Sequence, residues 1–512
     1  MENLDSYNQE LYDESDPKSI EDFAKALIGH TFEDVVLRRV KIDKECKHFA
    51  SGEQAEVYAN KKRKGGLGNL LEELYFGYKA NSDSNADFHE AGVELKVTPY
   101  EKNKKGELRA GERLVLTMIG NDAPVEEDFF QSHLWEKCRL ILLIYYLRDK
   151  SLESNLMYSI DYVNLFTPPE EDLEIIRQDY DKIISKIKAG KAHEISEGDT
   201  VYLGACTKGA TAAKSTVPQF YPPYTPARRR AFCYKNSYMT YVLNKYITQN
   251  VETYEPIIKD TEELKQRGFE DIITNKINQY IGTDDKTLCA MFEREYNNNK
   301  AQWIDLAYRM LGIRSNKAEE FIKANIVVKA IRLDEKGRMK ENSPLPPLRF
   351  MDLVDEQWED STLYNYLSEV KFLYVVFQKC GEEYVLRGCQ LWNMPAADLD
   401  EVQGEWERVK NVVTCGVEFT IVQQKNGCVV QNNLPKKSEN RITHLRPHTQ
   451  QTYYEFADGT VFGKGKLADS DLLPDGQRMT KQSFWLNNTY ILSQLDKNLT
   501  KPLILGEKSA II

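Results

Sequence analysis

An internal repeat limits what this chain can fold into more than any other feature of its sequence. Residues 169–190 align without a gap on residues 395–416, and four positions of the alignment are identical. The apolar residues recur at intervals of three and four in both copies: Leu173, Ile176, Tyr180, Ile183 and Ile187 in the first, and Leu399, Val402, Trp406, Val409 and Val413 in the second. This spacing predicts two amphipathic helices that bury the same face.

The flanks of the two helices also correspond in order. An apolar strand is predicted at 140–147 in the first copy and at 372–377 in the second, and an aromatic segment with asparagine comes late in each. Two copies of one domain type therefore account for the length of 512 residues. The expected organisation is an acidic N-terminal segment over 1–20, a first domain over 21–250, a polar linker with helical character over 251–274, and a second domain over 275–512.

The net charge of −11 does not exclude a polyanionic ligand, because the negative charge is concentrated near the N-terminus. Residues 1–24 carry eight acidic residues and one lysine, which supply most of the excess. The rest of the chain is nearly balanced and contains basic clusters at 61–64, 102–105, 228–230 and 436–437. Each cluster is either a binding surface or a solvated loop.

Membrane, secreted and cysteine-based classes are not expected. The densest apolar run, residues 140–147, is far shorter than the ~20 residues that a membrane-spanning helix needs. The first residues show neither a basic start nor an apolar core, so no secretory signal is predicted. Nine cysteines without a C-x-x-C pair indicate reduced thiols in a cytoplasmic protein, and predict neither a zinc ribbon nor a redox pair.

The first copy contains a group of charged residues that suits phosphodiester chemistry. A helix is predicted over 66–77 and a strand over 91–100, followed by a hairpin through 102–106 and a strand over 113–119. Because side chains alternate along a strand, Glu94 and Lys96 share a face, and Asp87 lies just before that strand. Two carboxylates can hold a hard divalent cation while the lysine orients or deprotonates water, which is the minimal site for metal-assisted hydrolysis of a phosphodiester.

The second copy contains a competing arrangement. Acid-x-Lys occurs several times by chance in a chain with this many charges, and Asp360, Glu369 and Lys371 precede an apolar strand in a similar way. The repeat favours the first copy, because the counterpart of 94–96 is Val327-Val328-Lys329. The second copy is therefore predicted to have lost its central acid.

Residues 86–100, with Asp87-x6-Glu94-x-Lys96, resemble the catalytic strand of the MutH family of DNA endonucleases, a branch of the PD-(D/E)XK fold. Residues 190–210, followed by 237–243, resemble more closely the Sau-type type II restriction endonucleases, which cut at GATC. The resemblance implies an α/β fold of two tandem domains, each a mixed central sheet flanked by helices, with the second copy catalytically degenerate. The chain departs from MutH near Cys206-Thr207, where MutH proteins carry an Arg-Pro pair, so methyl-state recognition of the MutH kind is not expected.

The resemblance also implies roles for individual residues. Asp87 and Glu94 would bind Mg²⁺, with the carbonyl of Leu95 as an extra ligand, and Lys96, the helical acid Glu72 and Lys137 would complete the catalytic site. The loop Lys64-Gly65-Gly66 would approach the DNA backbone. The other predicted DNA contacts are Thr207, Lys208, Tyr234, Lys235 and, in the second copy, Arg446.

The triplet Arg228-Arg229-Arg230 has two interpretations. It lies just ahead of an aromatic segment, so it is predicted to clamp backbone phosphates. The alternative is a solvated turn.

The sequence thus predicts a type II (IIE-like) restriction endonuclease that hydrolyses double-stranded DNA at GATC to give 5′-phosphate ends. The second domain would bind a second site as effector, two chains would pair transiently on DNA, and a cognate DNA methyltransferase would act in the same system. Two rivals remain: a methyl-directed mismatch-repair nickase, and a DNA-binding or modification-reading protein without catalysis. The second copy argues against the nickase, and the intact Asp87, Glu94 and Lys96 set argues against a protein without catalysis.

Overall fold

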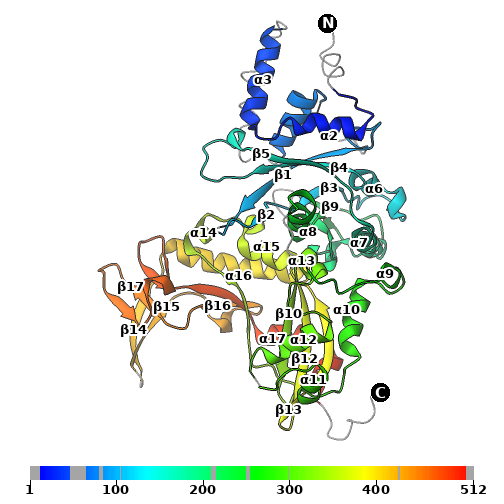
Figure 1. Ribbon diagram of the computed structural model, residues 1–512. Helices are drawn as coiled ribbons and strands as arrows, with labels where there is room; N and C mark the ends of the chain where they lie inside the picture. Colours follow the sequence, from blue (N-terminus) through cyan, green and yellow to red (C-terminus); the bar gives the residue numbers. More distant parts are fainter. Residues whose placement is uncertain are drawn as a thin grey trace. The chain divides into compact units, whose positions relative to one another are not determined.

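The computed structural model (Figure 1) describes residues 12–45, 65–79, 85–103, 105–208, 215–249, 254–297, 299–424 and 427–502. These residues form a mixed α/β protein, as predicted. The chain divides into two compact units. Unit 1 combines Met1–Glu255 with Asp260–Gln266 and Glu319–Asn325, and unit 2 combines Pro256–Lys259, Arg267–Ala318 and Ile326–Ile512.

The first sheet of unit 1 contains the predicted catalytic strand. Its order is β2-β1-β4-β5, with β1 at Glu94–Lys102, β2 at Leu108–Ala110, β4 at Ile141–Leu147 and β5 at Ile160–Phe166. Strand β1 runs parallel to β4, with Glu94 opposite Ile141, while β2 and β5 are antiparallel to their neighbours. Strand β4 is buried from Ile141 to Tyr145, as a central strand covered on both faces should be. The strands predicted over 91–100 and 140–147 are confirmed.

One predicted strand belongs to a second sheet of unit 1 and not to the sheet that contains β1. The hairpin after β1 leads to β2, whereas the strand predicted over 113–119 lies elsewhere. It is β3, Leu114–Met118, in the antiparallel order β3-β9-β6, with β9 at Arg230–Tyr234 and β6 at Leu203–Thr207. The three-residue β2 completes the hairpin and leaves β3 free to pair with β9. A short ladder joins β7, Thr216–Val217, to β8, Ala227–Arg228.

Helices cover the sheets of unit 1, and Figure 1 shows α2 and α3 on one side of the β1/β4/β5 sheet and α7 and α8 on the other. The helix predicted over 169–190 is α7, whose stripe is buried at Ile176, Tyr180, Ile183 and Ile187. The helical elements are α2 Pro17–Lys25, α3 Phe32–Glu45, α5 Gly66–Leu70, η1 Leu71–Phe76, η2 Phe129–Gln131, α6 His133–Cys138, η3 Asn155–Met157, α7 Glu170–Lys188, η4 Ala192–Glu194, η5 Glu197–Asp199, α8 Asn236–Val242, η7 Leu243–Ile247, α9 Thr261–Arg267 and α13 Glu319–Ala324.

Unit 1 extends beyond the boundary expected at residue 250. The Lys323 ammonium of α13 lies 2.6 Å from Asp172 of α7, and both side chains are almost fully buried. The segment expected to be a polar linker contains α9 and the start of the next helix, with Leu264 and Phe269 buried. Buried ion pairing and apolar packing therefore bring α9 and α13 into the compact unit of the first domain.

Unit 2 contains a sheet with the order β10-β12-β13, in which the first pair is parallel and the second antiparallel. Beside it are the sheets β11-β21-β16 and β18-β17-β20-β19 and the hairpin β14-β15. The strands are β10 Ile326–Leu333, β11 Ser343–Pro347, β12 Lys371–Cys380, β13 Glu383–Trp392, β14 Phe419–Gln424, β15 Gly427–Asn432, β16 Thr443–Pro447, β17 Tyr453–Glu455, β18 Val461–Gly463, β19 Ser470–Leu472, β20 Arg478–Thr480 and β21 Gln482–Leu486.

The helix predicted over 395–416 is α16 of unit 2, whose stripe is buried at Val402, Trp406, Val409 and Val413. The helical elements of this unit are α10 Phe269–Asn278, α11 Asp285–Met291, α12 Gln302–Met310, α14 Phe350–Asp355, η8 Trp358–Asp360, α15 Thr362–Glu369, α16 Ala396–Cys415, η9 Lys437–Glu439, η10 Leu467–Asp469, α17 Asn488–Gln494 and α18 Lys497–Thr500.

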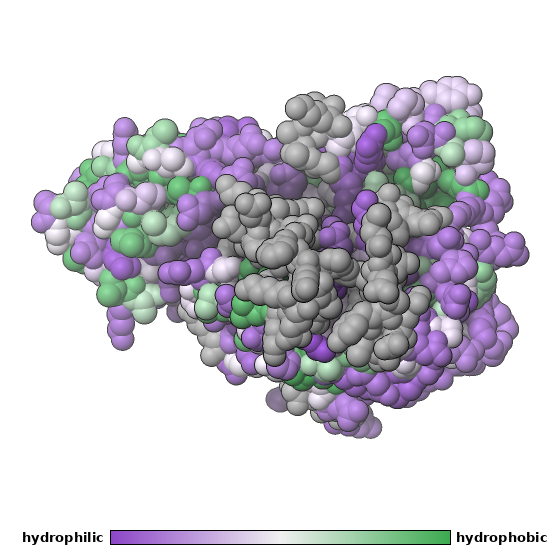
Figure 2. Space-filling model, turned by 90° about the horizontal axis from the view of Figure 1, so that it is seen from above, coloured by the Kyte–Doolittle hydropathy of each residue, from purple (hydrophilic) through white to green (hydrophobic). Residues whose placement is uncertain are grey.

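The face of the molecule seen in Figure 2 is mainly polar where it is coloured. In Figure 2 the coloured residues are mostly hydrophilic, and the hydrophobic ones occur in small groups. Within the described ranges, no helix combines the length and apolar character needed to span a membrane.

Candidate active site

Glu94, the first residue of β1, is the centre of the predicted site. Its side chain is only 3% exposed, and each carboxylate oxygen meets a lysine. Lys96 Nζ lies 2.6 Å from Oε1, and Lys137 Nζ lies 2.9 Å from Oε2. Lys137 comes from the last turn of α6 and also donates to the backbone carbonyl of Asn85. The structure therefore brings Glu94, Lys96 and Lys137 together.

A tight turn places Asp87 beside Glu94 at the start of β1. The backbone of Phe88 pairs with that of Val93, which returns the chain so that Asp87 lies against the start of β1. Asp87 Oδ2 accepts a hydrogen bond of 2.9 Å from the N–H of Leu95. Burial, together with the negative charge of Glu94, raises the pKa of Asp87 to about 6. The Glu94 carboxylate thus lies close enough to Asp87 to affect the ionisation of Asp87.

Glu72 contributes from the helical segment predicted over 66–77. That segment begins as α5 and continues as the π-helical turn η1, which holds Glu72 and ends at Gly77 with φ 84°. Burial and the charge of Asp87 raise the pKa of Glu72 to about 7, and the charge of Lys96 opposes this shift. Glu72 therefore belongs to the same electrostatic cluster as Asp87 and Lys96.

Tyr78 is a residue that the sequence analysis missed. Its hydroxyl is buried and has no hydrogen-bond partner among the described residues. Its ring packs edge-on against Phe88, with 5.4 Å between centroids, and its backbone N–H donates to the carbonyl of Glu72. Burial raises the pKa of Tyr78, and the charges of Asp87 and Glu72 add to the effect. Its position directly after the helix that carries Glu72 was the only signal in the sequence.

The donor set fits a hard divalent cation. Asp87 and Glu94 supply carboxylate oxygens, the ligands that Mg²⁺ and similar ions prefer. Burial and the repulsion from Glu94 raise the pKa of Asp87, and a bound cation would offset both costs of the ionised form. The backbone N–H of Leu95 already fixes the Asp87 carboxylate at the start of the strand.

Part of the predicted DNA surface is accessible. Arg229 is exposed, and Thr207, Lys208 and Arg228 are half-buried. Gly65 has φ 82° and immediately precedes α5, which begins at Gly66. Lys64 lies outside the described residues.

Three predicted DNA contacts are instead core residues. Arg230 is 6% exposed and donates through Nη1 to the carbonyl of Ala205 at 2.7 Å. Lys235 is 1% exposed and donates to the carbonyl of Thr200 at 2.6 Å, while Tyr234 is fully buried. Arg230 and Tyr234 belong to β9, and Lys235 directly precedes α8. Their side chains are buried, and Arg230 and Lys235 satisfy backbone carbonyls in the core, so these three residues are not accessible to DNA in this structure.

The competing acid and lysine set of unit 2 is differently arranged. Lys371 is buried in β12 and lies 2.6 Å from Glu270 of α10. Strand β10 carries Val327 and Lys329, and burial lowers the pKa of Lys329. On β16, Arg446 is exposed, and its guanidinium lies 4.9 Å from the ring centroid of Trp485.

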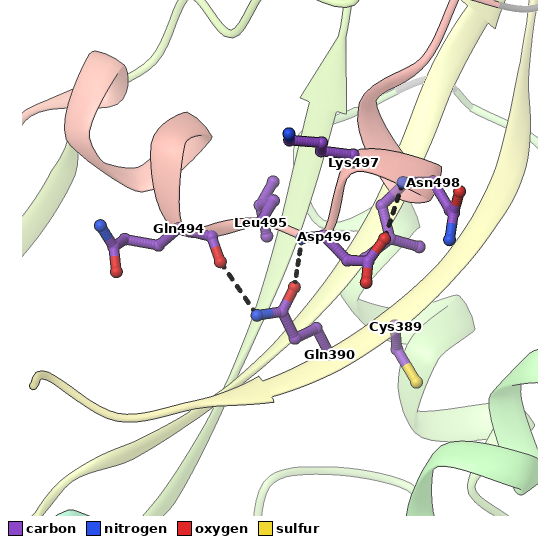
Figure 3. Close-up of a pocket in the computed structure, with 8 residues that line it drawn as sticks. Cys389, Gln390, Gln494, Leu495, Asp496, Lys497 and Asn498 are labelled. Carbon is purple, nitrogen blue, oxygen red and sulfur yellow. Dashed lines mark hydrogen bonds between the residues drawn. The ribbon is translucent and has the colours of Figure 1, made fainter.

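A shallow hollow on unit 2 (Figure 3) is lined partly by polar groups that already bind one another. Its lining comes from β13 and the segment around α17 and α18: Cys389, Gln390 and 494–499. The Gln390 amide donates to the carbonyl of Gln494 and accepts from the N–H of Asp496, so its polar groups are already paired.

Comparisons with known proteins relate this geometry to two groups of enzymes. The family described as DNA mismatch repair enzyme MutH matches residues 76–179, which include β1 and the residues around Glu94. The DNA mismatch repair protein MutH of Shigella boydii is 29% identical over 156 residues, covering 30% of this chain and 66% of the relative. The MutH of Escherichia coli strain HS is 28% identical over 156 residues, which again cover 30% of this chain and 66% of the relative.

A second similarity extends over both units. The type II restriction enzyme Sau3AI of Staphylococcus aureus is 34% identical over 464 residues, which is 85% of this chain and 93% of the relative. The chain belongs to the Sau3AI-like type II restriction enzymes of the MutH family. This restriction enzyme is therefore a DNA endonuclease, and its MutH-like part contains the cluster of Asp87, Glu94, Lys96 and Lys137.

Proposed function

We propose that this restriction enzyme hydrolyses both strands of DNA at GATC in a Mg²⁺-dependent reaction that leaves 5′-phosphate and 3′-hydroxyl ends. One observation carries the proposal: three carboxylates and two lysines from four segments of unit 1 share one electrostatic cluster at the start of β1. The members of the cluster are Asp87, Glu94, Glu72, Lys96 and Lys137.

Each member of the cluster has a distinct role in the proposal. Asp87 and Glu94 would hold Mg²⁺, with the carbonyl of Leu95 as a further ligand. When bound, the cation would polarise the scissile phosphate and lower the pKa of its water. Lys96 would hold the attacking water in line with the leaving 3′-oxygen, and Lys137 would offset negative charge on the phosphate. Glu72, with a pKa near neutrality, would accept a proton from that water.

The proposed GATC specificity rests on the resemblance of residues 190–210 to Sau-type enzymes. This segment leads into β6, whose end carries Thr207 and Lys208, both partly accessible. Arg228 and Arg229 would contact backbone phosphates, which position the protein without reading sequence.

The second unit would be a degenerate copy that binds another GATC as effector. Strands β10, β12 and β13 repeat the order and directions of β1, β4 and β5, and α16 follows them as α7 follows β5. The position equivalent to Glu94 is Val327, which cannot bind a cation, while Arg446 is exposed for phosphate contact. One intact site per chain implies that two chains pair transiently on DNA. A cognate DNA methyltransferase would protect the host sequence.

Mapping of fragment ends tests the specificity and the reaction together. Unmethylated genomic DNA is digested with the full chain, with and without Mg²⁺, and both ends of every break are sequenced. The proposal expects cuts in both strands at GATC, bearing 5′-phosphates, only with the metal. Any other consensus would contradict the specificity, and nicks in one strand alone would favour a MutH-like nickase.

A comparison of DNA with one and two sites tests the effector role. A coupling free energy of ~1–3 kcal/mol would make two-site DNA react about 5- to 150-fold faster. The Arg446→Ala variant should lose this stimulation and keep the one-site rate. The control is Arg349→Ala, since Arg349 is an exposed arginine of the same unit that lies near Asp352. Equal rates on both substrates would leave unit 2 without an effector role.

A further inference from the structure

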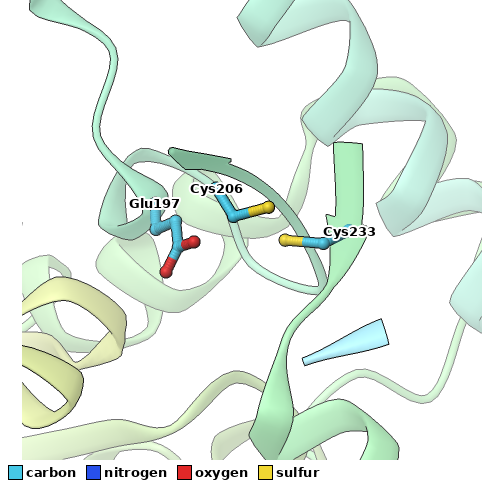
Figure 4. A group of neighbouring side chains, drawn as sticks. All are labelled: Glu197, Cys206 and Cys233. Carbon is cyan, nitrogen blue, oxygen red and sulfur yellow. The ribbon is translucent and has the colours of Figure 1, made fainter. Parts of the chain in front are cut away.

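A second group of possible metal ligands lies in unit 1, in residues that the proposed cleavage reaction does not use. Glu197, Cys206 and Cys233 are all buried, and one ligand atom from each lies within 4.8 Å of the others. Figure 4 shows the two sulfur atoms facing each other, with the Glu197 carboxylate beside them. The residues come from η5, β6 and β9, so the group exists only in the folded chain.

The pairing of β6 with β9 explains why the two thiols meet. Cys206 is opposite Ala231, and Cys233 is opposite Gly204, two positions along the same ladder. Side chains two positions apart share a face of a sheet, and Gly204 adds no side chain to separate the sulfurs. A Cβ atom at Gly204 would lie 3.2 Å from Cys233 Sγ, so the glycine leaves the space that this sulfur needs.

The buried carboxylate of Glu197 distinguishes this group from an ordinary apolar contact in the core. A pair of buried thiols alone would behave as two small apolar residues. However, Glu197 Oε1 accepts a hydrogen bond from Arg113, whereas its Oε2 is buried without a partner among the described residues. A buried carboxylate oxygen without a partner costs free energy, and an ion is one of the accepted reasons for such an atom.

We propose that Glu197 Oε2 and the sulfurs of Cys206 and Cys233 bind a thiophilic divalent cation of the zinc class. Thiolates with a carboxylate are zinc ligands, and three protein ligands leave the fourth tetrahedral position to water. Two thiolates and a carboxylate carry three negative charges, which a divalent cation and the Arg113 guanidinium together neutralise. The ion would link η5 to β6 and β9. It would thereby fix the position of Thr207, at the end of β6, and of Lys208, which follows it.

Cobalt substitution tests this site independently of DNA cleavage. The full chain is stripped of metal under reducing conditions and titrated with Co²⁺. A thiolate-to-cobalt charge-transfer band should appear and saturate at one equivalent, and Zn²⁺ should abolish it. Cys206→Ser and Cys233→Ser should each lose the band, while Glu197→Gln should keep it with weaker affinity.

Two controls separate this site from the catalytic cluster and from nonspecific thiol binding. Asp87→Ala should retain the band, because the catalytic carboxylates offer no sulfur. Cys138→Ser, which changes another buried cysteine of unit 1, should also retain it. Circular dichroism confirms that each variant is folded. Absence of the band in the unaltered chain, or its equal loss in Cys138→Ser, would overturn the proposal.

Discussion

The Lys137 ammonium lies 2.9 Å from the Glu94 carboxylate, although 43 residues separate them in the chain. Helix α6 supplies the lysine and β1 supplies the acid, and both side chains are at most 8% exposed. An ion pair so well shielded from water keeps much of its electrostatic strength. It therefore links the position of α6 to the chemistry proposed at β1.

The first prediction concerns this lysine. Lys137→Met should lower the cleavage rate on the order of 10²-fold, because a positive charge near the scissile phosphate is lost. Single-turnover kinetics on an oligonucleotide with one site would measure this. The control is Lys188→Met, which removes an exposed lysine of the same unit that pairs with Glu127. Equal rates for both variants would make Lys137 a structural residue only.

The second prediction concerns pH. The pKa values of Asp87 and Glu72 are raised to about 6 and about 7, so both groups lose their protons as pH rises through these values. At subsaturating Mg²⁺ the cleavage rate should therefore increase between about pH 5 and about pH 8, because Asp87 must be ionised to hold the cation and Glu72 must be ionised to accept the proton of the attacking water. Glu72→Gln should lower the rate, because the proton acceptor is lost, and the remaining rise should shift toward lower pH, because Asp87 then titrates alone. Glu73→Gln, the control on the same turn, should keep the rate and shift the profile only slightly, because the charge of Glu73 adds least to the raised pKa of Glu72. A flat profile in the unaltered enzyme would contradict the assignment.

The third prediction separates Tyr78 from an ordinary core tyrosine. Tyr78→Phe removes a buried hydroxyl without a described partner, so stability should hold or rise by about 1 kcal/mol. Cleavage should nevertheless fall roughly 10-fold, because the hydroxyl would donate a hydrogen bond at the catalytic cluster once DNA and metal are bound. Tyr75→Phe is the control, because the Tyr75 hydroxyl donates to the Phe23 carbonyl at 2.8 Å. That variant should lose about 1 kcal/mol of stability and keep its rate. Thermal melts and single-turnover rates give both readouts, and an unchanged rate for Tyr78→Phe would remove it from the site.

The fourth prediction concerns the boundary of unit 1. Lys323→Met leaves Asp172 as a buried charge without its closest cation, so the free energy of unfolding should fall by about 3 to 5 kcal/mol. The double variant Asp172→Asn/Lys323→Met should recover most of this loss, since no charge stays buried. Urea unfolding of the full chain would measure both. A chain ending at residue 250 lacks α9 and α13 and should be less stable still. If Lys323→Met is neutral, α13 does not stabilise the unit.

Local patterns in the sequence predicted the elements that carry the chemistry. The stripe at Ile176, Tyr180 and Ile183 predicts α7, and alternation along β1 places Glu94 and Lys96 on one face. Both features depend on residues only a few positions apart, so periodicity reveals them.

Long-range contacts account for what the sequence did not predict. Lys323 and Asp172 are 151 positions apart, so no local pattern indicates that α13 completes unit 1. Arg230 and Lys235 looked like surface cations, but their partners are backbone carbonyls on other segments. Cys206 and Cys233 form no spaced motif, and only the ladder between β6 and β9 brings them together.

Cleavage by Glu94→Gln tests the central claim most directly. This substitution keeps the size of the side chain and removes the charge that Lys96 and Lys137 flank. The matched variant is Glu369→Gln, which changes the acid of the competing set in unit 2. With Mg²⁺ and a duplex containing GATC, we predict that Glu94→Gln binds the duplex but shows no detectable cleavage, while Glu369→Gln cuts both strands at the rate of the unaltered enzyme. Cleavage retained by Glu94→Gln and lost by Glu369→Gln would contradict the account and place the catalytic site in the second copy.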